Sequence, residues 1–438
     1  MTGERERLML QGSEGLILPN EGIDLSHLSA QEDMPLRGGV ELNYPIYRSR
    51  QDEATEIVKR NKDNVEATVR ELGKKIHGSW DDYHGISYLH FPAATLDGLD
   101  IRGVAADYSV FTAGSLRHAL MDRASLYAAV FAATDLEGAS LVNVNARHLL
   151  APFANFSRSN LRSIKAESAV LNFANFYEAS LLGASLVGAY MIGVAGIEED
   201  AAKLASSFEG AVVLGNTSEG AEETTERIEG HALSSRFTTQ QMTTGTTEAK
   251  VYSRANWSRQ LSSSSNIEGA ILREIALGRA DLTHLQAIGS IWDQVTADEV
   301  RMRAGYVSGA TFFQTSLDGA DTNRAWFPAL VAIGSSFKGF RPGNIAGALF
   351  IDSDLSEMDT DLDLDAATGG AVIIGKEKHR PQIAEGNPME EDVLQTTIKE
   401  LPTYSQTIVS SLRRQRQLTT GARSKIDSKE IEQGQAQG

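Results

Sequence analysis

Residues 171–191 read LNFAN FYEAS LLGAS LVGAY M, with a large apolar side chain at every fifth position. Toward the N-terminus the same register extends back to Phe91, and no polar residue occupies any of these positions up to Met191. Small residues such as Ala174 and Ala184 recur two positions before the large ones. A period of five that is kept over roughly a hundred residues indicates one repeated structural unit.

A second part of the chain has the same spacing. Positions five apart from Ile267 to Phe337 are again apolar, except for Thr322. The register breaks around Pro342 and resumes, shifted, at Phe350 and Leu355. We therefore expect two repeat blocks, which are Phe91–Met191 and Ile267–Leu355.

The five-residue period decides the fold class, because it fits neither the 3.6-residue period of an α-helix nor the two-residue period of a strand. A chain that turns a corner every five residues points one large and one small side chain inward from each side. Four such sides close a coil of about twenty residues, and the coils stack at the ~4.8 Å spacing of hydrogen-bonded strands. The sequence predicts an all-β, quadrilateral β-helix with Gly, Asp, Asn and Ser at its corners.

These units resemble the pentapeptide-repeat family, whose usual unit is Ala-(Asp/Asn)-(Leu/Phe)-X-X. Close matches are Ala154-Asn155-Phe156, Ala174-Asn175-Phe176 and Ala280-Asp281-Leu282. The resemblance covers about half of the chain, and it implies a right-handed quadrilateral β-helix. It is far less specific for function, because one fold serves many functions. The stretches Ala146–Ala151 and Trp292–Met302 depart from the unit, and we expect bulged or inserted coils there.

The pattern divides the chain into five parts. We expect an N-terminal extension with a capping helix at 1–90, a first block at 91–215, a Ser/Thr/Glu-rich linker or loop at 216–266, a second block at 267–376, and a C-terminal helix with a polar tail at 377–438. Gly210–Asn216 and Gly370–Lys376 end the two blocks in the same way, which favours an internal duplication. The alternative is one solenoid with a long loop.

Both ends of the repeat region need a cover, since a solenoid's terminal coil has an open strand edge and an exposed core. Gln51–Ile76 places its apolar residues on one face and predicts an amphipathic helix that serves as the N-terminal cap. A short helix, interrupted near Pro402, is expected within residues 389–418. We expect small α-helical caps at both ends, and a terminal helix could also pair two copies of the chain.

Composition narrows the class of protein. The 438 residues contain no cysteine, which excludes disulfides and cysteine-based zinc sites. The N-terminus lacks the apolar core of a signal peptide, and no apolar run approaches the ~18 residues of a membrane span. We expect a cytoplasmic protein without a membrane span, or alternatively one that is secreted into a host without a cleavable signal.

Charge bears on the partner. The net charge is −17, which argues against direct binding of nucleic acid. Residues 91–196 carry 7 basic and 8 acidic side chains, whereas residues 266–365 carry 7 and 15. The acidity is therefore local to the second block.

Three motifs invite a chemical interpretation, and the first is Gly370–Lys376. It satisfies the start of a phosphate-binding loop, but Glu377 stands where that loop needs Ser or Thr. The interior of the segment is apolar and strand-like, so a structural strand is the better interpretation.

The second motif is an acidic run, made of Asp352, Asp354, Asp359, Asp361, Asp363 and Asp365. Calcium prefers such oxygen ligands, but the calcium loop also needs glycine in its sixth place and glutamate in its twelfth. Counted from Asp359, those places hold Leu364 and Gly370. On strands, alternate Asp side chains would face water and guard an edge.

The third motif is a group of His77, Asp81, Asp82 and His84 beside Trp80 and Tyr83. Imidazole and carboxylate groups suit a metal or acid–base site. Packing of the cap and hydrogen bonds in turns explain the same residues with fewer assumptions. We therefore assign no catalytic, cofactor-binding or metal-binding residue and expect no cofactor.

The leading hypothesis is a non-enzymatic scaffold that binds a protein partner through an extended face. The resemblance offers an alternative, since some family members imitate DNA and bind or protect type II topoisomerase (gyrase). A secreted bacterial effector is a further alternative, in which the polar tail from about Thr419 would hold the secretion signal.

Overall fold

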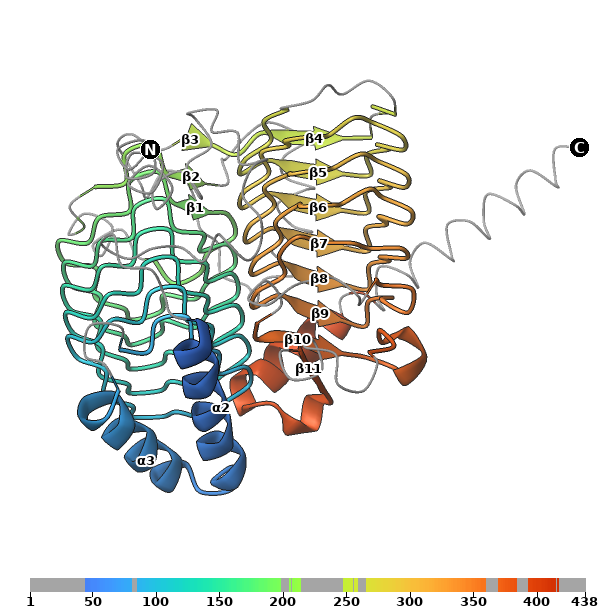
Figure 1. Cartoon of the computed structure of the whole chain (residues 1–438). Helices are drawn as coiled ribbons and strands as arrows, with labels where there is room; N and C mark the ends of the chain where they lie inside the picture. Colours follow the sequence, from blue (N-terminus) through green and yellow to red (C-terminus); the bar gives the residue numbers. More distant parts are fainter. Residues whose placement is uncertain are drawn as a thin grey trace, which may run out of the picture.

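The computed structural model describes residues 44–80, 85–197, 205, 207–213, 247–254, 256–258, 265–359, 369–383, 393–414 and 416. Most of these residues form two stacks of square coils that lie side by side (Figure 1). The first stack contains the described residues between 85 and 248, and the second contains those between 251 and 396. The expected all-β, right-handed quadrilateral β-helix with small terminal helices is confirmed.

The coils repeat every twenty residues in the first stack. Parallel bridges join Thr95 to Ser115, Ser115 to Asp135 and Asp135 to Asn155, and the other sides of the coil repeat the pattern. Three short strands close this stack at its far end, in the order β1-β2-β3. They are β1 (Tyr190–Met191), β2 (Val212–Val213) and β3 (Thr247–Glu248).

One side of the second stack is an eight-stranded parallel sheet in the order β11-β10-β9-β8-β7-β6-β5-β4. The strands are β4 (Val251–Ser253), β5 (Ile271–Arg273), β6 (Ile291–Asp293), β7 (Thr311–Phe313), β8 (Val331–Ile333), β9 (Leu349–Ile351), β10 (Ala371–Ile374) and β11 (Val393–Thr396). Val331 pairs with Leu349, so this coil is two residues shorter than the usual twenty. The shortening accounts for the shift of register around Pro342.

Each side ends in a turn whose third residue has a left-handed backbone. In the turn Leu116–Ala119, Ala119 N donates to Leu116 O over 3.1 Å and His118 has φ 57°, as in a type II turn. Alanine, arginine and glutamine occupy other such corners, although the left-handed region costs a non-glycine residue about 1–2 kcal/mol. Ladder hydrogen bonds on both sides of each corner hold the turn.

This geometry corrects one expectation. The stretches Ala146–Ala151 and Trp292–Met302 are not bulged, since their bridges keep the twenty-residue spacing. His148 and Gln294 take the left-handed corner position there without glycine, with φ of 58° and 56°. A poor match to the repeat unit therefore did not signal an irregular coil.

The N-terminal cap is two helices and not the single helix predicted over Gln51–Ile76. These are α2 (Tyr44–Arg60) and α3 (Val65–Gly78). The break falls at Asn61–Asn64, where the Asn64 side chain caps α3 by accepting from Ala67 N over 3.0 Å.

The cap closes the open edge of the first coil. Gln51 Nε2 donates to His90 O over 2.8 Å, and His90 N donates to Gln51 Oε1 over 2.6 Å. The side-chain amide thus replaces the missing neighbouring strand. On another side of the same coil, His77 Nε2 donates to Asp100 O over 2.8 Å.

The predicted start of the second block at residue 267 is too late. β4 pairs with β5, and Asn256 bridges to Ala276, so residues 251–256 already belong to the second stack. β3 pairs with β2 in the first stack and is separated from β4 by Ala249 and Lys250 alone. The chain therefore passes from one stack to the other within two residues. Residues 216–246, 255 and 259–264 of the predicted linker lie outside the described residues.

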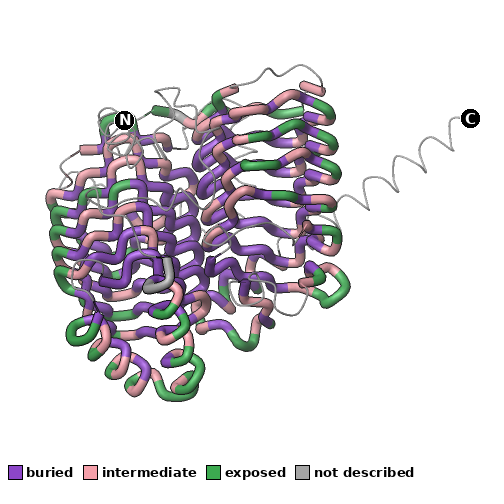
Figure 2. Tube along the Cα trace, in the orientation of Figure 1, coloured by how far each residue is buried: buried purple, intermediate pink, exposed green. Residues whose placement is uncertain are grey.

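The two stacks run in opposite directions (Figure 1). A β-carbon placed on Gly289 would meet Tyr190, one on Gly309 would meet Val170, and one on Gly370 would meet Val110. Residue numbers rise along one stack as they fall along the other. We call the contact between the two stacks the seam. A continuous group of buried apolar residues fills it (Figure 2).

Candidate interaction surfaces

The segment Gly370–Lys376 is structural. Ala371 to Ile374 form the buried strand β10 between β9 and β11, and Gly370 packs against Val110 across the seam. The backbone amides are thus part of a ladder and do not form a phosphate-binding loop.

The described aspartates of the acidic run each lie beside a different basic side chain. Arg413 pairs with Asp352, His379 Nδ1 lies 3.2 Å from Asp354 Oδ2, and Arg341 Nε lies 3.1 Å from Asp359 Oδ2. Asp361, Asp363 and Asp365 lie outside the described residues. Within the described part of the chain, no group of three or more His, Asp or Glu side chains could hold a metal ion.

The histidine group before the first coil is resolved in part. His77 serves the coil edge, while Trp80 Nε1 donates to Glu53 Oε2 over 3.2 Å and Arg50 lies 5.0 Å from the Trp80 ring. These contacts are packing of the cap. Asp81, Asp82, Tyr83 and His84 lie outside the described residues, so the predicted group is not tested as a whole.

Charged side chains on the outer sides of both stacks pair from coil to coil. Arg117, Glu137, Arg158 and Glu178 form a continuous row with N–O distances of 2.8, 3.0 and 2.9 Å. In the second stack Arg279 Nε lies 2.7 Å from Glu299 Oε2, and Arg303 pairs with Asp321 at 2.5 Å. Exposed pairs of this kind contribute little stability, about 0–1 kcal/mol each. Their main effect is to neutralise the acidic side chains on the surface.

Large exposed hydrophobic residues gather on the first stack. Among the described residues, those with the most exposed side chains are Tyr177 (51%), Leu182 (40%) and Leu120 (37%). Tyr177 and Leu182 flank one corner of the same coil, and Leu120 lies on the side of the coil that carries Leu182, three coils away. The side with Leu120 and Leu182 is opposite the seam, whereas the side with Tyr177 adjoins the seam side. We call these two adjacent sides the outer faces of the first stack.

The seam was not predicted from the sequence. It is lined by outward-pointing residues of the first stack that recur every twenty residues: Val110, Val130, Leu150, Val170 and Tyr190. Because they fall between the inward positions, a search for the five-residue period does not mark them. The signal that could have found them is an apolar series of period twenty at positions that normally face water.

Polar contacts fix the seam as well. Thr112 Oγ1 donates to Gly347 O and Asn172 Nδ2 donates to Gly289 O, each over 2.7 Å in a buried environment. Both acceptors are backbone carbonyls at left-handed corners of the second stack. The two stacks are therefore held in register by bonds that cannot form if one stack slides.

A partly buried carboxyl group lies at the end of the seam nearest the connection between the stacks. Tyr190 Oη donates to Glu268 Oε2 over 3.1 Å, and Glu268 Oε1 has no hydrogen-bond partner among the described residues. Burial raises the pKa of Glu268 to about 7, against the smaller opposing effects of the bonds from Tyr190 and Asn266.

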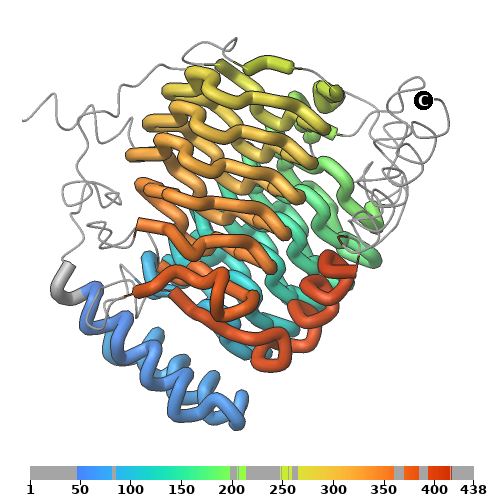
Figure 3. Tube along the Cα trace, turned by 90° about the vertical axis from the view of Figure 1, so that its right-hand side faces the viewer, coloured from blue at the N-terminus to red at the C-terminus, as the bar shows by residue number. Residues whose placement is uncertain are grey.

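A C-terminal helix, residues 403–414, lies along the seam on the side opposite α2 and α3 (Figure 3). Ile408, Val409 and Leu412 are buried against both stacks. The helix predicted within residues 389–418 is thus present, and it begins directly after Pro402. Its apolar face is used inside the chain, so the expected pairing of two copies through a terminal helix stays a prediction and would need another surface.

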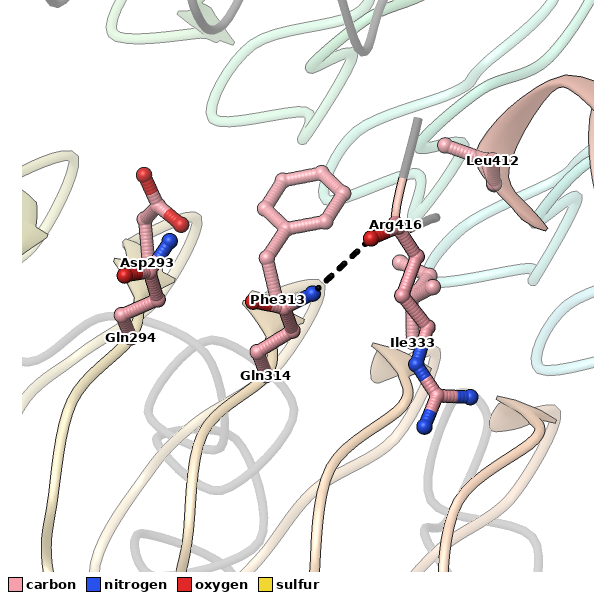
Figure 4. Close-up of a pocket in the computed structure, with 7 residues that line it drawn as sticks. All are labelled: Asp293, Gln294, Phe313, Gln314, Ile333, Leu412 and Arg416. Atoms are coloured by element: carbon pink, nitrogen blue, oxygen red, sulfur yellow. Dashed lines mark hydrogen bonds between the residues drawn. The ribbon is translucent and has the colours of Figure 1, made fainter. Parts of the chain in front are cut away.

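A shallow recess lies where this helix ends (Figure 4). It is lined by Asp293, Gln294, Phe313, Gln314, Ile333, Leu412 and Arg416. Gln314 Nε2 donates to Arg416 O over 3.4 Å, so the recess is bounded by the helix itself. The recess is therefore part of the surface on which the helix packs.

The stacked square coils, their left-handed corners and the Ala-Asn-Phe units define a pentapeptide-repeat β-helix. A family model for pentapeptide repeats (8 copies) matches residues 154–191. Residues 154–191 thus match pentapeptide repeats, and the resemblance read from the repeat units is confirmed.

Solved structures of the same class are similar to parts of the chain. HetL of the cyanobacterium Nostoc sp. strain PCC 7120 is 17% identical, with a TM-score of 0.20, over 58% of this chain and 90% of that one. Full-length QnrB1, a plasmid-mediated fluoroquinolone resistance protein, is 11% identical, with a TM-score of 0.17, over 72% and 98%. A protein of the Arabidopsis thaliana thylakoid lumen is 23% identical, with a TM-score of 0.11, over 32% and 86%.

No curated protein matches the chain. In the described part of the chain, no helix has the length and apolar character needed to cross a membrane.

Proposed function

We propose that the chain is a non-enzymatic scaffold, and that a protein partner binds the outer faces of its first stack. The observation that carries the proposal is the position of Leu120, Tyr177 and Leu182. These are the most exposed large hydrophobic residues of the described chain, and all three lie on these two adjacent sides. Exposed apolar groups that gather on one surface are typical of a binding site.

Two further features support this choice. The ladder of backbone bonds makes the surface rigid, so a partner pays little to order it. The paired charges around it, such as Arg158 with Glu178, leave it nearly neutral. Such a surface suits a partner that presents apolar and hydrogen-bonding groups more than one that presents a strong opposite charge.

The test is affinity capture with the intact chain. One variant combines Leu120→Glu, Tyr177→Ser and Leu182→Glu. The control variant carries Thr296→Glu and Asn323→Glu, at two exposed positions of the second stack. A partner that binds the outer faces is lost with the triple variant and kept with the control. If the captured proteins are the same with both variants, this surface is not the binding site.

The gyrase alternative is less favoured by the surface. A DNA mimic needs rows of carboxylates that face outward without basic neighbours. Here Glu137, Glu178 and Glu299 each pair with an arginine. A supercoiling assay separates the two functions: unchanged gyrase activity and quinolone sensitivity at stoichiometric protein exclude the alternative. The effector alternative depends on a tail that lies outside the described residues.

A further inference from the structure

The C-terminal helix is attached to the stacks in a different way from that in which the coils are attached to one another. Consecutive coils are joined by ladders of backbone hydrogen bonds. The hydrogen bonds and ion pairs between the helix and the stacks use side chains. Tyr404 Oη donates to Phe153 O over 2.8 Å, and Ser405 Oγ donates to Ala113 O and Ala133 O over 2.8 and 3.0 Å.

The other end of the helix is held by charge. Arg413 pairs with Asp352, and Arg416 Nη1 lies 3.9 Å from Asp352 Oδ2. Asp352 stands at the left-handed corner after β9, so the second stack supplies the acidic partner. The helix therefore joins the two stacks like a clasp, with hydroxyl groups on the first and guanidinium groups on the second.

The seam does not depend on this clasp. Thr112 and Asn172 bond directly to carbonyls of the opposite stack, and Val170 packs on Gly309. If the helix left, the two stacks would stay together and a groove along the seam would open. Segments with few bonds to the rest of a protein are those that open locally.

The groove has a defined chemistry. Its apolar wall contains Phe313 and Ile333, which lie beside Leu412, and its carbonyl acceptors are those of Ala113, Ala133 and Phe153. Asp352 lies at the end where the helix finishes. An amphipathic helix with hydroxyl groups in its first turn, an aliphatic face and a basic last turn matches all three features.

We propose that residues 403–414 are a releasable clasp, and that the groove beneath them binds such an amphipathic helix of a partner protein. This site is separate from the outer faces of the first stack and does not depend on them. The clasp then controls access, because the partner helix and the clasp occupy the same groove.

The test uses the intact chain and a fluorescent peptide with the sequence of residues 401–416. Arg413→Glu with Arg416→Glu turns attraction to Asp352 into repulsion. Lys399→Glu with Arg414→Glu makes the same change of charge at exposed positions, and it is the control. Hydrogen exchange of residues 403–414 measures release, and fluorescence anisotropy measures binding of the peptide.

We expect exchange of the helix amides to rise about tenfold in the clasp variant, in line with the loss of two charge-assisted contacts, while the ladder amides of residues 110–131 are unchanged. The peptide binds the clasp variant more tightly than the wild type or the control, and a peptide with Ile408→Glu and Leu412→Glu does not bind. Unchanged exchange in the clasp variant overturns the proposal. So does a released helix whose groove takes up no peptide, or equal binding of both peptides.

Discussion

Gly309 packs against Val170 so closely that a β-carbon on Gly309 would stand 2.9 Å from Val170 Cγ1. This contact joins the two stacks at mid-height, and it leads to a first prediction. Gly309→Ala adds overpacking of about 1–3 kcal/mol to the cost of the left-handed backbone. Gly319→Ala is the control. Gly319 has nearly the same left-handed backbone, with φ 67° against 61° for Gly309, but a β-carbon on Gly319 would have its nearest neighbour 3.6 Å away.

Chemical denaturation measures the difference. In both variants we expect the free energy of unfolding to fall by ~1–2 kcal/mol, because alanine takes up a left-handed backbone. In Gly309→Ala it falls further. Equal losses in the two variants would mean that the stacks do not meet at this glycine.

The second prediction concerns pH. Burial raises the pKa of Glu268 to about 7 from an ordinary value of 4.5, so the folded chain holds a proton that the unfolded chain has lost. The resulting stabilisation is complete below pH 4.5 and is lost as the pH rises through 7. From the size of the shift it amounts to at most about 3 kcal/mol.

Glu268→Gln keeps an acceptor for Tyr190 and removes the titration. We expect the change in unfolding free energy between pH 5 and pH 8 to be smaller in this variant than in the wild type. Glu299→Gln, at an exposed ion pair, is the control and should leave the pH dependence as it is. The same pH dependence in wild type and Glu268→Gln would show that the carboxyl group is not buried in the seam.

The third prediction concerns the cap. Burial, with a smaller effect of Arg48, lowers the pKa of His90 to about 3, so its ring is neutral in the folded chain. Because the folded pKa lies below the ordinary 6.5, the stability that a neutral His90 contributes is present above pH 6.5 and is lost as the pH falls toward 3. In NMR spectra the His90 ring signals should not shift between pH 8 and pH 5. A midpoint near 6.5 would place His90 in water.

The fourth prediction tests how the cap closes the first coil. Gln51→Leu removes both bonds to the backbone of His90 and leaves two buried groups unpaired, at roughly 1–3 kcal/mol each. We expect faster hydrogen exchange in residues 85–105, while residues 150–170, several coils away, keep their protection. Uniform exchange rates in wild type and variant would mean that the edge is closed by other means.

The fold could be predicted because its signal is local and regular. Phe111 and Phe131 stack in the core at 4.9 Å, and their positions follow directly from the five-residue period. The break between α2 and α3 was missed even though Asn64 is a readable N-cap. The apolar stripe continues from α2 into α3, so the apolar period alone does not mark the break.

The candidate surfaces were harder to predict. The seam residues Val110 and Val170 occupy outward positions, and their pairing with glycines of the second stack depends on how two whole stacks meet. Ser405 bonds to carbonyls that lie 272 and 292 residues earlier in the chain. No local pattern encodes such a contact, because it is set by the number of coils in each stack.

The antiparallel pairing of the two stacks is tested most directly by a disulfide across the seam. The natural chain has no cysteine, so introduced pairs react cleanly. Val170→Cys with Gly309→Cys joins positions whose β-carbons would lie 3.0 Å apart, close to the ~3.5–4.5 Å of a disulfide. Val110→Cys with Gly309→Cys is the control, because Val110 lies against Gly347 and Gly370 instead. We predict that under mild oxidation the first pair crosslinks within one chain and the second does not; crosslinking of the second pair, or of neither, would contradict the paired-stack structure.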